Sequence, residues 1–238
     1  MEEINLENDK SDIVAVIMKS VVSLVPYIGG PIAEVIGYVV PNQRLDRLTR
    51  FVKIIKEKVE DIDEKINKRS KQDPIFLDFF EDELTQVSRA TTEERMNYLS
   101  NLLVNGIDSD EADLLAAKQL LRILGQLNDA EIIWLKYYYT DYAERKDFIE
   151  KNSALLQPIP RYMTMDKKDY RTSVIQESYK QRLEELHLVE SKIRFDSETG
   201  LPKLNSPKIG FEKKSIEITP LGKQLIEIIT DHTNYPEK

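Results

Sequence analysis

The feature that most constrains this chain is one strongly apolar run, Ser11–Val40, in a sequence of which 32% of the residues are charged. Two glycines and two prolines interrupt it: Pro26, Gly29, Gly30 and Pro31. A membrane-spanning helix needs about 20 uninterrupted apolar residues, and each arm of the run is shorter. Proline removes a helical hydrogen bond, and glycine permits the backbone to reverse. The run therefore predicts an apolar hairpin of two short helices.

Three roles fit this apolar hairpin. It can lie in the protein core, pack against copies of itself, or enter a bilayer from one side. Its arms are apolar nearly all round, whereas a helix that covers one side of a core carries a polar face. Only Lys19 and Glu34 are charged between Ile13 and Val40, and we expect them to pair across the hairpin, because pairing lowers the cost of burial. The predicted membrane or assembly residues are these two charges and the four turn residues.

The composition and motifs of the chain argue against most kinds of catalytic site. The chain has no cysteine, which excludes disulfides, thiolate metal sites and cysteine nucleophiles. Its two histidines, His187 and His232, are far apart, and neither a phosphate-binding loop nor a nucleophile elbow occurs. We therefore expect no catalytic residues, no metal, no cofactor and no enzymatic activity. The acidic start lacks the basic leader of a secretion signal, so we expect a cytoplasmic protein, peripheral at the inner membrane if the hairpin binds there.

After the hairpin, apolar residues recur at alternating steps of three and four, which predicts a long heptad helix. These residues are Leu45, Leu48, Val52, Ile55, Val59, Ile62 and Ile66. The helix is expected to end near Asp73-Pro74. Two partners fit its narrow apolar seam: an antiparallel helix of the same chain, or the same seam of a second copy. The second would make it an oligomer seam.

Residues 73–157 are expected to form a helical domain, between the first region at 1–72 and a third at 158–238. Thr91 to Glu94 predicts a capping box with Thr91 as the N-cap. Asn128-Asp129-Ala130-Glu131 predicts a second capped start, for a helix that carries Trp134. We expect this single tryptophan to be a core or contact residue.

The third region changes pattern. A helix at 170–186 precedes an extended segment, a turn-rich stretch at 196–210 and an alternating strand at 215–219. Thr219-Pro220 then predicts a helix start with proline at the first helical position. The phrases LEELHLVES and IEITPLGKQLIEII resemble the corresponding parts of winged-helix domains. The expected fold is mainly α, with a winged-helix-like α+β domain at the C-terminal end.

A winged helix raises the question of DNA binding. The candidate contacts are the cations of the 167–186 stretch: Lys167, Lys168, Arg171, Lys180 and Arg182. Carboxylates are interleaved with them, and the whole chain has a net charge of −8. Because the affinity for nucleic acid comes largely from cations that release counterions, nucleic acid is a partner that the sequence permits but does not favour.

Two further stretches suggest a family. ERMNYLSNLLVNGID, followed by KQLLRILGQLNDAEIIWLKYY, resembles the Abi-alpha family of bacterial abortive-infection proteins. Leu127 to Glu131 and Leu221-Gly222 stand where that family has a capped helix start and a C-terminal turn. The resemblance covers about half of the chain and brings no catalytic residues. It implies a role in defence against phage, with growth arrest or membrane damage as the outcome.

Three hypotheses follow. The leading one is a non-enzymatic, anti-phage defence or toxin-like protein that acts through the apolar hairpin, by membrane association or by self-assembly. The second is a winged-helix transcriptional regulator that binds DNA as a dimer through the heptad seam. The third is a protein-interaction adaptor. The expected partners are a second copy of the chain or another protein, with a membrane surface as a further candidate.

Overall fold

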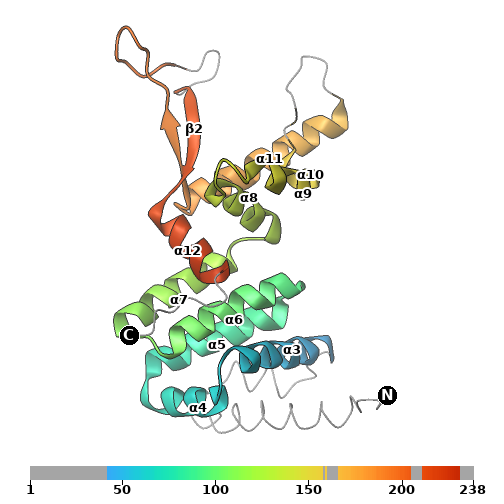
Figure 1. Cartoon of the computed structure of the whole chain (residues 1–238), viewed down its shortest axis with the longest axis vertical. Coiled ribbons are helices and arrows are strands. Elements are labelled where there is room, and N and C mark those ends of the chain that lie inside the picture. Colours follow the sequence, from blue (N-terminus) through green and yellow to red (C-terminus); the bar gives the residue numbers. More distant parts are fainter. Residues whose placement is uncertain (1–41, 158, 160–165, 205–210, 231–238) are drawn as a thin grey trace. The chain divides into compact units, whose positions relative to one another are not determined.

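The structure is a computed structural model that describes residues 42–157, 159, 166–204 and 211–230 (Figure 1). Within these ranges the chain is mainly helical, with ten helices and one two-stranded antiparallel sheet near the C-terminal end. The predicted fold class is confirmed to that extent. The apolar hairpin and its six predicted functional residues lie outside the described residues. The chain divides into two compact units, residues 126–227 and the remainder, and each is described by itself.

Five helices form the described part of the N-terminal unit. They are α3 (Asn42–Lys58), α4 (Ile62–Gln72), α5 (Pro74–Arg89), α6 (Glu93–Ile107) and α7 (Glu111–Gly125). Helix α5 packs against all four others, and α6 packs against α3, α4 and α7. Their apolar faces enclose a core of large, fully buried side chains that includes Phe51, Phe76, Phe79, Leu99, Leu103 and Leu121.

The predicted heptad helix is two helices, which corrects the prediction of one long helix. Helix α3 ends at Lys58, and Asp61 adopts a left-handed backbone conformation (φ 56°) before α4 begins at Ile62. Aspartate tolerates this conformation better than most residues do. The apolar spacing continues through the break because both helices turn the same face toward the core. Heptad spacing therefore predicted which residues are inside, but not that the helix is continuous.

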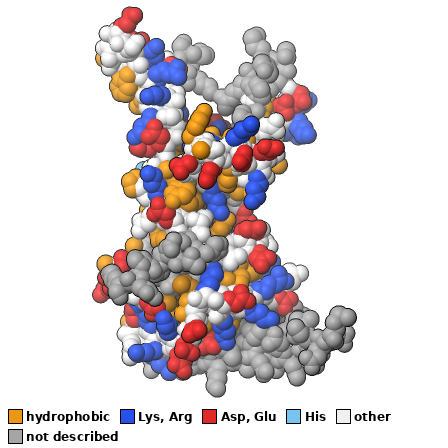
Figure 2. Space-filling model, in the orientation of Figure 1, with side chains coloured by type: hydrophobic (Ala, Val, Ile, Leu, Met, Phe, Trp, Pro, Cys, Tyr) orange, Lys and Arg blue, Asp and Glu red, His pale blue; other side chains and the backbone are white. Residues whose placement is uncertain are grey.

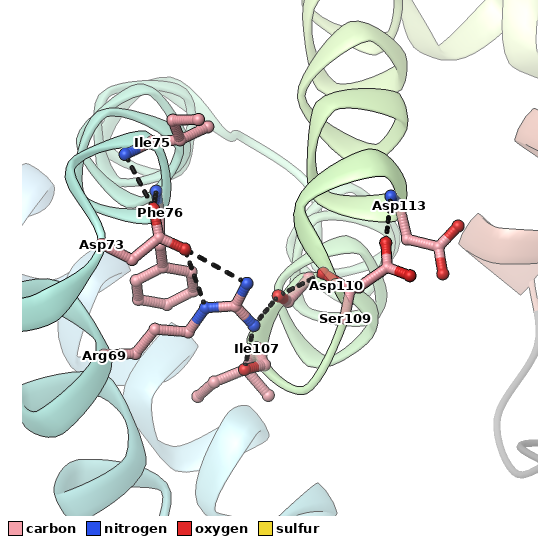
Figure 3. Close-up of polar contacts among 9 residues, drawn as sticks. Arg69, Asp73, Ile75, Phe76, Ile107, Ser109, Asp110 and Asp113 are labelled. Carbon is pink, nitrogen blue, oxygen red and sulfur yellow. Dashed lines mark hydrogen bonds and ion pairs between the residues drawn. The ribbon is translucent and has the colours of Figure 1, made fainter.

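Arg69 ties three helices of the N-terminal unit together (Figure 3). Its Nη1 donates hydrogen bonds to the backbone oxygens of Gly106 (2.9 Å) and Ile107 (2.5 Å), at the end of α6. Its guanidinium also pairs with Asp73 (3.3 Å). Asp73 in turn caps α5 by accepting from two backbone N–H groups of its first turn. The predicted helix end at Asp73-Pro74 is thus confirmed, and one arginine satisfies carbonyls that the end of α6 leaves open.

The C-terminal unit combines helices of different lengths with a β-hairpin. Its elements are α8 (Asp129–Tyr139), α9 (Arg145–Lys151), α10 (Ser153–Leu156), α11 (Lys167–Glu185), β1 (Val189–Ile193) and β2 (Lys213–Ile218), followed by α12 (Pro220–Thr230), of which residues 220–227 belong to this unit. Helix α8 packs against α9, α11 and β2. The strands pair antiparallel, with Val189 opposite Ile218 and Ser191 opposite Ile216. Leu135, Leu183, Leu188 and Leu225 are fully buried in this unit.

Gly222 fixes the junction of β1, β2 and α12. A Cβ atom at this position would lie 2.1 Å from the backbone oxygen of Leu188, so no other residue fits without a shift of the backbone. Thr219 completes the junction: its hydroxyl donates to the His187 oxygen (2.7 Å) and accepts from the Gly222 N–H (3.1 Å). The helix start predicted at Thr219-Pro220 is confirmed, because α12 begins at Pro220.

The division into units differs from the three regions expected from the sequence. The observed boundary lies between Gly125 and Gln126, so residues 126–157 belong with the β-hairpin unit. The reason is tertiary packing, since α8 contacts α11 and β2. Local composition changes at Pro158 and Pro160, but it does not report which helices pack together.

Candidate functional site

The far part of the β-hairpin, called here the distal hairpin, comprises residues 194–204 and 211–212. Figure 1 shows the β-hairpin extending away from the helices of its own unit. Three backbone hydrogen bonds close a ring within it. Arg194 N–H donates to the Glu212 oxygen (2.7 Å), Lys203 N–H to the Arg194 oxygen (2.8 Å), and Glu212 N–H to the Lys203 oxygen (2.7 Å). The distal hairpin therefore has backbone pairing of its own beyond β1 and β2.

One side of the distal hairpin is apolar. Phe195 pairs with Pro202, and Leu204 pairs with Phe211, in isolated antiparallel bridges. Residues directly opposite in such a pair point to the same side, as do residues two apart on one strand. Pro202 and Leu204 are two apart, so all four side chains lie on one side. Phe195 is 59% exposed, Leu204 74% and Phe211 50%. Three large apolar side chains therefore gather on an exposed side of the distal hairpin.

The other side of the distal hairpin is charged. Arg194 pairs with Glu212 (2.9 Å), and Lys203 pairs with Asp196 (3.3 Å). The Asp196 carboxylate also accepts from the backbone N–H groups of Thr199 and Glu198, both at 3.0 Å. These two hydrogen bonds, with the help of Lys203, lower the pKa of Asp196 to about 2. The turn at 196–199 is held by a carboxylate that stays ionised.

Figure 2 shows both kinds of side chain on this structure. Apolar side chains lie beside Lys and Arg at the upper left, where Figure 1 draws the β-hairpin. The sequence between residues 192 and 214 contains six Lys and Arg against three Asp and Glu. This stretch is positive in a chain whose net charge is −8. It combines exposed apolar side chains with local positive charge.

The five predicted nucleic-acid contacts all lie on α11, but the structure separates them. Lys167, Lys168 and Arg171 are exposed at its start. Lys180 Nζ lies 4.8 Å from the centre of the Trp134 ring. Arg182 contacts Gln126 (3.1 Å) and Glu185 (3.4 Å). Only the first three cations are therefore grouped on an open surface.

The exposed side of α11 carries large apolar side chains as well as its basic ones. Tyr170 is 61% exposed, and Val174 and Ile175 are each 50% exposed. The C-terminal unit contains 17 Lys and Arg against 17 Asp and Glu, so its formal charge is zero. A neutral unit with apolar side chains on its outer helix is a weaker match to DNA than to a partner with apolar surface.

The residues of the predicted oligomer seam are divided between core and surface. Ile55, Ile62 and Ile66 are buried within the N-terminal unit. Leu48, Val52 and Val59 are half-buried, and the side chain of Leu45 is not described. The buried residues do what the intramolecular interpretation of the seam expects. A seam between copies stays a prediction for the half-buried ones.

A lysine, a serine and an asparagine meet where α3 ends on α6. Lys58 Nζ donates to Ser100 Oγ (2.5 Å) and to Asn101 Oδ1 (2.6 Å), and burial lowers the pKa of Lys58. A serine beside such a lysine has the residue types of a nucleophile and its base. Ser100, however, is fully buried in the middle of α6, and its hydroxyl donates to the Asn97 oxygen. The group therefore satisfies buried polar atoms and has no access for a substrate.

Sequence reasoning missed the apolar side of the distal hairpin. The sequence pattern predicts only a turn-rich stretch at 196–210, which Phe195 and Phe211 flank. The detectable signal was the two-residue step from Pro202 to Leu204, together with two phenylalanines at the ends of the stretch. The pairing that aligns all four side chains is long-range, and it emerges only from the fold.

The described residues show neither a metal-binding cluster nor a membrane-spanning helix. They contain no cluster of three or more His, Asp or Glu side chains placed to hold a metal ion. No helix in these ranges combines the length and the apolar character that crossing a bilayer requires. Comparison of the chain with protein-family models, with curated proteins and with solved structures finds no match. The resemblance to the Abi-alpha family therefore stays a prediction.

Proposed function

We propose that the protein is a non-enzymatic binding protein whose C-terminal unit is a winged-helix domain that attaches to anionic membrane surfaces through its wing. In this proposal α11 is the second core helix, the β-hairpin is the wing, and the distal hairpin is its tip. One observation carries the proposal: Phe195, Pro202, Leu204 and Phe211 share one open side of the distal hairpin.

The energetics favour a lipid surface for such a tip. Burying one large apolar side chain is worth about 1.5–3 kcal/mol when burial is complete. Each Lys or Arg near an anionic leaflet adds about 1 kcal/mol. The ion pairs of the distal hairpin are exposed, and exposed pairs contribute little. Lipid phosphates can therefore compete for Arg194 and Lys203 without a large loss of folding stability.

The proposal extends the membrane hypothesis drawn from the sequence. In the hypothesis drawn from the sequence, the apolar hairpin at Ser11–Val40 is the membrane-binding element. It lies outside the described residues. The wing supplies a second contact in the described part of the chain. Two weak membrane contacts on one chain bind more strongly than either alone. The role in phage defence rests on the Abi-alpha resemblance, and it stays part of the proposal.

Vesicle co-sedimentation of the full chain tests the wing. Wild type should sediment with vesicles that contain phosphatidylglycerol, and less with pure phosphatidylcholine. The F195D/F211D double variant should lose at least about tenfold in affinity, because two apolar anchors become charged. Leu115→Asp in α7 is the matched control, since Leu115 is as exposed as Phe211 but lies outside the wing. Equal binding by wild type and the double variant would refute the role of the wing.

A second function, DNA binding, is favoured by the three cations at the start of α11. Lys167, Lys168 and Arg171 have no ion-pair partner among the described residues. If they contact phosphates, replacing all three with glutamine should weaken binding uniformly across sequences. The logarithmic slope of affinity against salt should then fall by about one per cation removed. A mobility-shift titration at two salt concentrations measures both. An unchanged slope would exclude this function.

A further inference from the structure

The C-terminal unit contains a cavity of about 430 Å³ that neither the wing nor the exposed side of α11 uses. Its walls come from α8, α9, α10, α11 and β2, together with Ile159. Ligand sites for small molecules are typically about 300–1,000 Å³. The lining residues include three aromatic side chains, Trp134, Tyr137 and Tyr138, and three charged ones, Arg145, Glu177 and Lys180. Its size therefore suits a small organic ligand.

One wall of the cavity is an aromatic cluster. Trp134 and Tyr137 meet edge to face, with ring centres 5.7 Å apart, and Tyr137 and Tyr138 do the same at 5.1 Å. Burial raises the pKa of Tyr138 well above its ordinary value, so its hydroxyl stays protonated. The three side chains come from a little more than one turn of α8. They offer ring surface to a flat ligand.

Two cations lie against these rings. Arg145 Cζ is 5.2 Å from the centre of the Tyr137 ring, and Lys180 Nζ is 4.8 Å from that of Trp134. The Arg145 Nη2 is anchored on the Thr140 oxygen (2.9 Å). Arg145 belongs to α9 and Lys180 to α11. Both cations are thus held beside the cavity by separate helices.

Two buried donors on these side chains have no acceptor. Trp134 is 5% exposed, and its Nε1 has no hydrogen-bond partner; the Nε of Arg145 is also buried and without a partner. A buried donor without an acceptor costs about 1–3 kcal/mol, so a native structure seldom leaves two together. Both atoms lie beneath the surface of the cavity and do not face its open space, so a ligand reaches them only if these side chains shift.

We propose that this cavity binds a small anion that carries an aromatic ring, with the chemistry of a nucleoside monophosphate. The ring would lie against the aromatic wall, where base–aromatic stacking contributes about 1–3 kcal/mol. The anionic oxygens would accept hydrogen bonds from the side chains of Lys180 and Arg145, which both line the cavity. The one carboxylate among the lining residues, that of Glu177, is mostly exposed, and Lys180 Nζ lies 3.9 Å from it. The donors therefore dominate the charge inside. This inference is independent of the wing.

The chain carries its own reporter for the test, because Trp134 is its only tryptophan and lines the cavity. Adenosine 5′-monophosphate, adenosine and inorganic phosphate are titrated against the full chain, by tryptophan fluorescence and by calorimetry in parallel. The monophosphate should bind saturably. Adenosine and phosphate should each bind at least about tenfold more weakly, because each lacks one of the two recognised parts.

Variants assign the binding to this cavity. Lys180→Met keeps most of the stem and removes the charge, and it should weaken the monophosphate by about tenfold or more, as loss of a charged hydrogen bond does. Lys223→Met on α12 is the matched control and should bind as wild type, since Lys223 is exposed and is not part of the cavity lining. F195D/F211D should also bind as wild type, which separates this inference from the wing. No heat and no fluorescence change at millimolar ligand, equal affinity for adenosine, or unchanged affinity in Lys180→Met would each overturn the proposal.

Discussion

Glu83 should make the stability of the N-terminal unit fall as pH rises. It lies in α5 on the same buried stripe as Phe76, Phe80 and Val87, and it is fully buried. Neither carboxyl oxygen has a hydrogen-bond partner. Burial, with a smaller effect of the neighbouring Asp82, raises the pKa of Glu83 well above its ordinary value. A protonated carboxyl is the form that such an apolar site favours.

The sign and size of the effect follow from proton linkage. Above the ordinary carboxyl pKa the unfolded chain has lost this proton, while the folded chain still holds it. The free energy of unfolding then falls by about 1.4 kcal/mol per pH unit, until the raised pKa of the folded state is reached. Glu83→Gln keeps the shape and cannot ionise. Above about pH 5 the stability of this variant relative to wild type should therefore rise as the pH rises, with the slope that the loss of one proton gives.

Urea unfolding followed by far-ultraviolet circular dichroism measures the difference, and hydrogen exchange of peptides from α5 locates it. Glu60→Gln is the matched control, because Glu60 is exposed in the same unit, and it should show no such trend. A constant difference between wild type and Glu83→Gln across this pH range would refute the argument. It would mean that Glu83 is ionised in the folded protein or reached by water.

Three further predictions concern the C-terminal unit. Gly222→Ala should cost about 3 kcal/mol or more, because its Cβ would meet the Leu188 oxygen, and thermal unfolding followed by Trp134 fluorescence should show the loss. Asn128→Ala should cost about 1 kcal/mol in the same assay, since it removes the side-chain acceptor of a capping box; Asn128→Asp should restore most of it. Carbon NMR should show the Asp196 carboxyl titrating near pH 2. The stabilisation that the ionised carboxylate gives the turn is then fully present above the ordinary carboxyl pKa and is lost as the pH falls through about 2. A titration midpoint near about pH 4, the ordinary value, would contradict the turn geometry.

Local chemistry allowed several helix ends to be predicted from the sequence. Asn128 combines a capping side chain, and Pro220 an N-terminal proline, with the start of an apolar pattern, and each marks an observed helix start. Asp73-Pro74 is the predicted end of the heptad helix, and α4 ends at Gln72, directly before it. The predicted cap at Thr91 was wrong by one residue. Thr92 accepts from the Arg95 N–H instead, because two adjacent threonines offer the same chemistry and only the packing of α6 selects one.

What the sequence could not provide depends on contacts between distant residues. The apolar side of the distal hairpin requires the pairing of Phe195 with Pro202 and of Leu204 with Phe211. The cavity forms where α8, α9 and α11 come together. Tyr137 and Lys180 both line it, but they are far apart in the sequence, and no sequence pattern connects them. The break at Asp61 was hidden because apolar spacing continues through it. Periodicity reports which side is buried, and it does not report what covers that side.

The most direct test of the central claim places a fluorophore at the tip of the wing. A chain with Phe211→Trp and Trp134→Phe carries its only tryptophan in the distal hairpin. Vesicles of phosphatidylglycerol with brominated acyl chains should quench its emission and shift it to shorter wavelength, and the quenching should depend on the depth of the bromine. Emission that is unchanged by these vesicles would contradict the claim, because it would show that the apolar side of the distal hairpin never enters lipid.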